Sequence, residues 1–205
     1  MNRRESRNSV RRRRNAQPGQ NIPNAILASV DHARGLFEAG RNKDAISFLR
    51  EKCNSGQNHP YLLSVLGAYE VQTGLHEIGL QHSRDAANAS KDNFVILSNL
   101  GLQLTALGHA GEAVDVLSKA AGLAPDTTEI RYTLAKALLL SEQFDAAEKS
   151  VRTYIEACPD DLLGHILLID ILEQSDQTDA AITHCTELIR EYPLKLGVHN
   201  KYVDC

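Results

Sequence analysis

The sequence predicts an all-α protein, a right-handed superhelical solenoid of antiparallel helical hairpins. Two observations carry this prediction. Apolar residues recur at helical spacing in two blocks of residues 94–127, and the pattern of that segment returns every 34 residues without an insertion. The composition agrees, because 42% of the residues are hydrophobic but only 5% are aromatic. Such a chain can build a continuous core of Leu, Ala, Ile and Val with few large anchors.

Residues 94–127 read as one hairpin of two amphipathic helices. Leucines at three and four spacing mark the first helix, and small or branched residues mark the second. Gly108 lies between them, where a positive φ ends one helix and lets the chain reverse. Pro125 stops the second helix, and Asp126 with Glu129 three residues later predicts an N-cap and capping box for the next one.

Stepping by 34 residues from this hairpin finds the same features along the chain. Pro125 is matched by Pro159 and Pro193. The residue expected where the two helices cross is small in five consecutive windows, at Ala45, Gly79, Ala113, Ala147 and Ala181. We therefore predict a repeat domain over residues 23–195, with units at 26–59, 60–93, 94–127, 128–161 and 162–195.

The pattern Leu97-x2-Leu100-Gly101-x2-Leu104, followed by Ala113-x3-Leu117, Ala120 and Pro125, resembles the tetratricopeptide repeat. Three departures from it stand out. Glu70 occupies a position where the family usually has an aromatic residue, Tyr154 replaces a small residue, and Ile169 stands where Gly or Ala would fit. The last predicts a wider helix crossing in the fifth hairpin.

The two ends of the chain differ from the repeats. Residues 1–22 contain almost no large apolar side chains, which predicts a disordered tail. Seven arginines against one glutamate give the first twenty residues a charge of +6, so the rest carries −10. A solvated tail is one interpretation, and a weak contact with anions, nucleic acid or the acidic body is the other. Residues 196–205 read as a short or truncated capping helix.

That short end leads to a further expectation. Leu168, Leu172 and Leu188 correspond to positions that a following hairpin should cover, and only ten residues follow. We therefore expect this C-terminal edge to self-associate or to dock onto a further domain.

No motif for catalysis or a cofactor is found, so the sequence favours a protein that is not an enzyme and needs no metal. His76 and His82 are six residues apart, about 240° around a helix, and cannot share a metal ion. The four cysteines are widely spaced, which favours reduced thiols in a cytoplasmic protein. Cys185 is expected in the core and His184 on the surface. No apolar run is long enough for a membrane span.

The resemblance implies that the first helix of each repeat lines a concave groove. The second, fifth, sixth, ninth, twelfth and thirteenth positions of those helices then supply the contacts. The candidate partner-binding residues are Arg34, Tyr61, Val65, Asn99, Leu102, Tyr132, Lys136 and Asp170. The family's carboxylate clamp and its ladder of asparagines are both absent, because Ala68 and Leu102 interrupt the first and only Asn99 remains of the second.

Two functions follow from this resemblance. The first is a protein–protein interaction scaffold that holds a partner peptide or helix in the groove. The alternative is the N-terminal repeat region of a bacterial multidomain enzyme, with a sulfotransferase, glycosyltransferase or hydroxylase domain further along.

Overall fold

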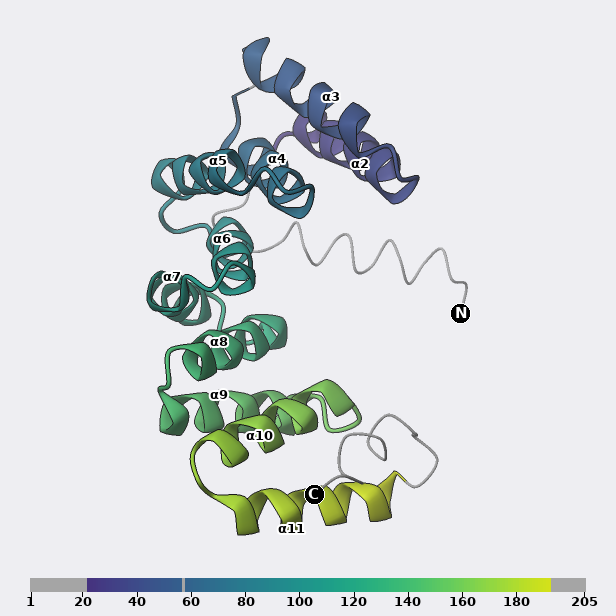
Figure 1. Ribbon diagram of the computed structural model, residues 1–205. Helices are drawn as coiled ribbons and strands as arrows, with labels where there is room; N and C mark the ends of the chain where they lie inside the picture. The colour runs from purple at the N-terminus through teal and green to yellow at the C-terminus, as the bar shows by residue number, and fades with distance from the viewer. Residues whose placement is uncertain (1–21, 57, 193–205) are drawn as a thin grey trace. The chain divides into compact units, whose positions relative to one another are not determined.

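The computed structural model of the chain describes residues 22–56 and 58–192. Within these ranges the chain forms ten α-helices and no strand, which confirms the all-α repeat prediction (Figure 1). The helices are α2 (Asn24–Glu38), α3 (Asn42–Asn54), α4 (Pro60–Gln72), α5 (His76–Ala89), α6 (Phe94–Ala106), α7 (Ala110–Leu123), α8 (Thr128–Leu140), α9 (Phe144–Ala157), α10 (Leu162–Gln174) and α11 (Thr178–Glu191). The predicted tail and the C-terminal capping helix lie outside the described residues.

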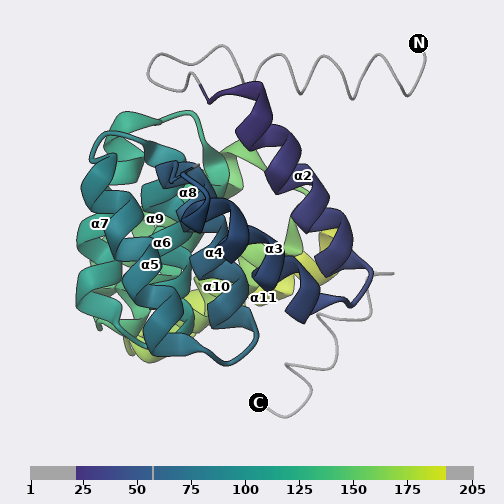
Figure 2. The same ribbon diagram turned by 90° about the horizontal axis from the view of Figure 1, so that it is seen from above.

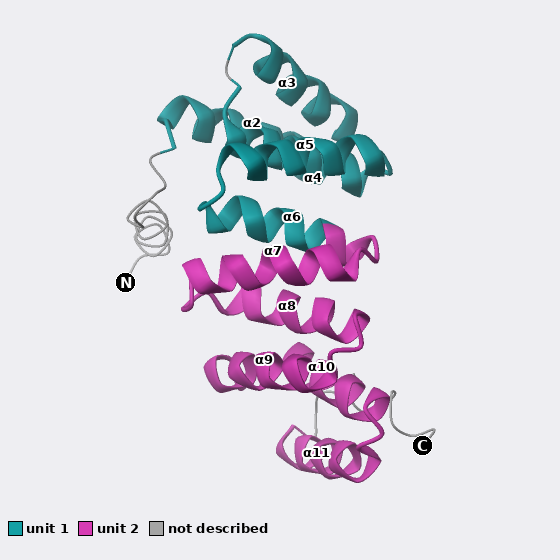
Figure 3. Ribbon diagram, turned by 90° about the vertical axis from the view of Figure 1, so that its left-hand side faces the viewer, with its two compact units in different colours: residues 1–103 teal, residues 104–205 magenta. Residues whose placement is uncertain are grey.

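The chain divides into two compact units, and the division lies inside α6 (Figure 3). Unit 1 spans residues 1–103, so its described part holds α2 to α5 and most of α6. Unit 2 spans residues 104–205, and its described part holds the end of α6 and α7 to α11. By the bounds of the predicted repeats, the first helices are α2, α4, α6, α8 and α10.

The core of unit 1 begins where α2 and α3 lie alongside one another and pack against α4 (Figures 1 and 2). Its cluster contains Ile26, Val30, Ala33, Ile46, Leu49, Leu62, Val65 and Leu66. The next pair, α4 and α5, is in direct backbone contact. A Cβ atom added to Gly67 would lie 2.5 Å from the carbonyl oxygen of Gly79, and one added to Gly79 would lie 2.6 Å from that of Gly67. No Cβ atom therefore fits at these two positions of the crossing.

Unit 2 fills equivalent positions differently. Ile169 stands at the repeat position of Gly67 and is fully buried, so α10 accommodates a branched side chain where α4 accommodates none. Tyr154 stands where α7 has Ala120, and its ring packs over Gly164, which stands where α8 has Ile130. Compared with Ala120 and Ile130, the large residue and the small residue have therefore exchanged positions in Tyr154 and Gly164.

The turn inside each repeat places one residue in the left-handed region. Gly40, Gly74 and Gly108 have φ between 76° and 91°, as predicted for Gly108. The same position holds Glu142 (φ 58°) and Asp176 (φ 60°) in the last two repeats. Each turn closes with the same backbone bonds, for example His109 N to Leu104 O at 2.9 Å and Gln177 N to Leu172 O at 2.9 Å. Every repeat thus has a residue in the left-handed conformation at this turn, even where that residue is not glycine.

The predicted N-cap at Asp126 is wrong by one residue. Helix α8 begins at Thr128 with Thr127 as its N-cap, and neither Asp126 nor Thr127 caps it with a side-chain hydrogen bond. The cap position of the repeat is the residue after Asp126, because the backbone first turns from Ala124 to Thr127 (Thr127 N to Ala124 O, 3.0 Å). At the equivalent position Asp161 does cap α10, accepting from Leu163 N at 3.0 Å.

The three leucines of the last repeat that were expected to need a cover, Leu168, Leu172 and Leu188, are 1%, 1% and 2% exposed. Self-association through the C-terminal edge stays an untested prediction. The exposed large apolar side chains among the described residues of this repeat are Leu163 and Ile182, at 56% each.

Candidate partner-binding surfaces

Unit 1 brings together the candidates on α2 and α4. Val65 is 9% exposed and belongs to the core cluster, because the sixth residue of α4 faces α2. Tyr61 is half-buried against that cluster. Of these two side chains, Tyr61 is therefore the one that a partner can contact. Val65 belongs to the core cluster against which Tyr61 packs.

An aromatic pair that the sequence analysis did not select lies in the same unit. Phe37 and Tyr69 stack with ring centroids 4.1 Å apart. Burial raises the pKa of Tyr69, and the nearby Arg34, which also hydrogen-bonds to it, opposes that rise. Arg34 pairs with Asp31 at 3.3 Å and is half-exposed. Phe37 occupies the twelfth position of the first repeat, one of the groove positions, but it was not among the eight selected candidates.

The two candidates on α6 differ in exposure. Asn99 donates through Nδ2 to the Oγ atom of the buried Ser64 at 3.1 Å, which ties α6 to α4. Leu102 is 55% exposed. Asn99 therefore has a structural role, and Leu102 is available for contact.

Unit 2 holds the remaining candidates around one tyrosine. Tyr132 on α8 packs against Tyr154 with ring centroids 5.2 Å apart, and the ammonium of Lys136 lies 5.8 Å from the Tyr132 ring. Burial raises the pKa of Tyr132, and the charges of Asp161 and Asp170 raise it further. The phenol therefore keeps its proton at neutral pH, beside a cation and near two carboxylates.

The structure thus divides the predicted set of eight between two units. Arg34, Tyr61, Val65, Asn99 and Leu102 lie in unit 1, and Tyr132, Lys136 and Asp170 lie in unit 2.

A different site lies among the second helices of unit 1. The carboxylate of Glu70 is fully buried in α4. Its Oε1 atom accepts from Nε and Nη2 of Arg50 on α3 at 2.9 and 2.7 Å, and its Oε2 atom lies 2.6 Å from Nδ1 of His82 on α5. Glu70 therefore links three helices. The sequence showed it only as a polar residue at an aromatic position, and nothing in the spacing pointed to Arg50 or His82.

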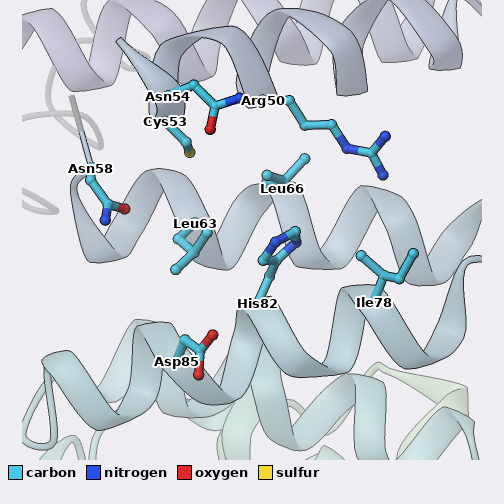
Figure 4. Close-up of a pocket in the computed structure, with 9 residues that line it drawn as sticks. All are labelled: Arg50, Cys53, Asn54, Asn58, Leu63, Leu66, Ile78, His82 and Asp85. Carbon is cyan, nitrogen blue, oxygen red and sulfur yellow. The ribbon is translucent and has the colours of Figure 1, made fainter. Parts of the chain in front are cut away.

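A pocket of about 580 Å³ adjoins this network between α3, α4 and α5 (Figure 4). It is lined by Arg50, Cys53, Asn54, Asn58, Leu63, Leu66, Ile78, His82 and Asp85. Burial raises the pKa of the Cys53 thiol, and the charge of Glu70 raises it further, so the thiol is not activated as a nucleophile.

Other expectations concern metals and buried residues. No group of three or more His, Cys, Asp and Glu side chains suited to a metal ion is found in residues 22–56 and 58–192. Cys185 is buried, as expected. His184 is half-buried rather than on the surface, and its Nε2 atom lies 3.1 Å from Nδ1 of the buried His165. No helix of the described chain is long and apolar enough to cross a membrane.

Comparisons with known proteins agree on the fold. Residues 104–171 match a tetratricopeptide repeat family model. No curated protein matches the sequence. The chain is similar in structure to MamA 41-end from Desulfovibrio magneticus RS-1, with 17% identity, a TM-score of 0.74 and coverage of 85% of this chain and 99% of that one.

Two further solved structures are similar. A tetratricopeptide repeat protein from Parabacteroides merdae has 16% identity and a TM-score of 0.74, over 89% of this chain and 72% of that one. MamA from strain AMB-1 has 23% identity and a TM-score of 0.70, over 78% and 94%. This repeat fold builds extended surfaces for protein partners and serves as an interaction scaffold. The family match over residues 104–171, the ten helices of the described residues and the unbroken 34-residue register together support a fold of about five tetratricopeptide repeats.

Proposed function

We propose that this protein is a scaffold that binds a peptide or a helix of a partner protein along the first helices of its repeats. The observation that carries the proposal is the environment of Tyr132. Its ring is held by Tyr154 on one side and approached by Lys136, so the side chain is already ordered before a partner arrives. A tyrosine fixed in this way supplies contact area at little entropic cost.

The charged side chains near Tyr132 determine which polar groups of a partner suit this surface. The exposed ammonium of Lys136 suits a carboxylate or a backbone carbonyl of the partner. Asp170 is close enough to raise the pKa of Tyr132, so it suits an amide or a cation on the other side. A peptide backbone carries both kinds of group at short spacing, which favours an extended or helical peptide over a purely apolar ligand.

Unit 1 supports the same proposal with a separate surface. Leu102 is 55% exposed on α6, and Tyr61 is half-buried on α4. Tyrosine is one of the residues that dominate binding energy at protein interfaces, and Leu102 adds exposed apolar surface to it.

The proposal is tested by selecting peptides of about 12 residues from a random displayed library against the full chain. The affinities of the selected peptides are then measured by fluorescence anisotropy. Tyr132→Ala should weaken one class of peptides about 30-fold, as expected for an interface anchor worth about 2 kcal/mol. Leu102→Ser should weaken the class that uses unit 1.

The matched control is Ile182→Ser, because Ile182 is 56% exposed but lies on the second helix of its repeat. It should change no affinity by more than about twofold. The proposal is contradicted if the selected peptides bind Tyr132→Ala and Leu102→Ser as tightly as the unchanged chain, or if Ile182→Ser alone weakens them.

A further inference from the structure

The buried Glu70 carboxylate holds two basic side chains in fixed positions. Arg50 binds Oε1 with two of its nitrogens, and the His82 ring binds Oε2. A buried carboxylate needs such partners, because its desolvation costs several kcal/mol. Since Arg50 and His82 meet the same carboxylate, their contacting nitrogens lie within about 8 Å of each other.

Each basic side chain keeps one polar group for another partner. A carboxylate paired with a guanidinium only accepts hydrogen bonds, so Nδ1 of His82 is the donor and Nε2 faces elsewhere. Among the described residues, neither Nη1 of Arg50 nor Nε2 of His82 has a hydrogen bond. The Arg50 and His82 side chains are 44% and 30% exposed, and both line the pocket in Figure 4.

The rest of the pocket combines an apolar floor with amides. Leu63 and Leu66 of α4 form the floor, and Ile78 of α5, 50% exposed, stands at one side (Figure 4). Asn54 and Asn58 add amide donors. Asp85 also lines the pocket and accepts from Gln81 Nε2 at 2.8 Å. Its negative charge disfavours ligands with several negative charges, such as phosphates, more than ligands with one.

This pocket is separate from the proposed first-helix surface. Leu63, Leu66 and Glu70 fall within about 60° of each other around α4, whereas Tyr61 and Val65 lie about 160° away from Leu63 on either side. The second helices α3 and α5 supply the other lining residues, apart from Asn58 in the loop before α4. A ligand here therefore leaves the Tyr61 face of α4 free.

We propose that the pocket between α3 and α5 binds a single carboxylate carried on an apolar body, with the carboxylate at Arg50 and His82 and the apolar part on Leu63, Leu66 and Ile78. The carboxylate accepts a hydrogen bond from Nη1 of Arg50, whose positive charge also attracts it. The size of the pocket falls in the range of small-ligand sites. Two sources share this chemistry, the C-terminal residue of a peptide and a free organic acid.

The test follows ¹H–¹⁵N NMR spectra of the full chain with N-acetyl-leucine and with N-acetyl-leucinamide, which has the same body without the charge. The acid should give saturable shifts at Arg50, Ile78 and His82 with a Kd of about 1 mM, and the amide should bind at least about tenfold more weakly. Ala-Ala-Leu with a free carboxyl group, compared with N-acetyl-leucine, shows which source binds more tightly.

Variants complete the test. Arg50→Lys keeps a positive charge for Glu70 but removes the guanidinium fork, and it should weaken the acid about tenfold. Ile78→Ser changes only a half-exposed side chain, so it keeps the fold and should also weaken the acid. Arg152→Lys is the matched control, since Arg152 pairs with Glu148 at 2.7 Å on α9, away from the pocket, and it should have no effect.

Two results would overturn the proposal. One is a set of shifts that do not saturate or that lie outside the pocket residues. The other is equal binding of the acid and the amide, with Ile78→Ser unchanged. Either result leaves the proposed first-helix surface untouched, because no residue of that surface enters this experiment.

Discussion

Unit 1 and unit 2 solve the same packing problem with different residues. In unit 1, α4 and α5 approach so closely that Gly67 and Gly79 leave no room for a Cβ atom. In unit 2, the position of Gly67 holds Ile169, and a tyrosine, Tyr154, replaces the usual alanine opposite a glycine, Gly164. The repeat therefore fixes which positions meet. At one pair, Tyr154 with Gly164, the large and the small residue are exchanged, whereas at the position of Gly67 the size of the residue itself changes.

The units also differ in how they bury polar groups. Unit 1 buries the charge of Glu70 and compensates it with Arg50 and His82. Unit 2 instead pairs the buried His165 with the half-buried His184, and Nε2 of His165, which lies 2.8 Å from the Pro159 carbonyl, donates to it. The first arrangement leaves the guanidinium of Arg50 at the edge of a pocket. In the second, His165 contacts His184 and the Pro159 carbonyl. This difference is the reason why the proposed ligand site lies in unit 1.

The largest expected effect tests the exchange of volumes in unit 2. Tyr154→Ala should destabilise the protein by about 4 kcal/mol, because it leaves a cavity over Gly164 and removes the hydrogen bond from Tyr154 to Asp161. Adding Gly164→Ile restores the alanine and isoleucine arrangement of Ala120 and Ile130, and should recover at least about half of the loss. Urea unfolding followed by circular dichroism measures both. A double variant no better than the sum of the single ones would show that the two positions are not coupled.

A slightly smaller loss is expected at the close crossing in unit 1. Gly67→Ala places a Cβ atom 2.3 Å from Ser83 Oγ and 2.5 Å from the Gly79 carbonyl, and backbone cannot move aside as a side chain can. The cost should be about 3 kcal/mol in the same measurement. Gly35→Ala is the control, because no atom lies within 4 Å of its added Cβ, and it should stabilise α2 by up to about 1 kcal/mol. Equal effects at the two glycines would contradict the close contact.

The turns give a prediction of opposite sign in the two units. Glu142→Gly and Asp176→Gly in unit 2 should each stabilise the protein by about 0.5 kcal/mol, since they relieve a left-handed residue at the cost of a more flexible unfolded chain. Gly74→Ala in unit 1 should destabilise it by about 1 kcal/mol. The changes in stability of the three variants are measured by thermal unfolding. A loss of stability in Glu142→Gly would mean that its side chain contributes more than the turn conformation costs.

The smallest effect concerns pH. Burial lowers the pKa of His184, with further lowering by His165 and Arg152 and an opposing effect of Glu187. The folded state therefore binds a proton less readily than the unfolded state, so the full stability is present above about pH 6.5 and falls as the pH drops toward the folded pKa. The melting temperature should decrease between pH 7 and pH 5, and less steeply in His184→Gln. Burial also lowers the pKa of His59 in unit 1, and that contribution should remain in both proteins. An unchanged slope in the variant would contradict the prediction.

The sequence by itself determined the helices and their order. The 34-residue register predicted the repeats, the turn at Gly108 and the buried Cys185, because hydrophobic period and backbone chirality act locally and leave a direct pattern in the chain. The same register assigned the partner-binding candidates to first helices. It could not separate Val65, which the neighbouring α2 covers, from Leu102, which stays exposed, because the two differ only in what lies beside them.

Only the tertiary structure decided the features that depend on pairs of distant residues. Arg50, Glu70 and His82 lie in three helices and are up to 32 positions apart in the sequence. Their meeting follows from helix packing, which no local pattern records. The same holds for Tyr154 over Gly164. Tyr154 alone reads as a departure from its repeat, and only the packed structure shows that the glycine beside it leaves room for the ring.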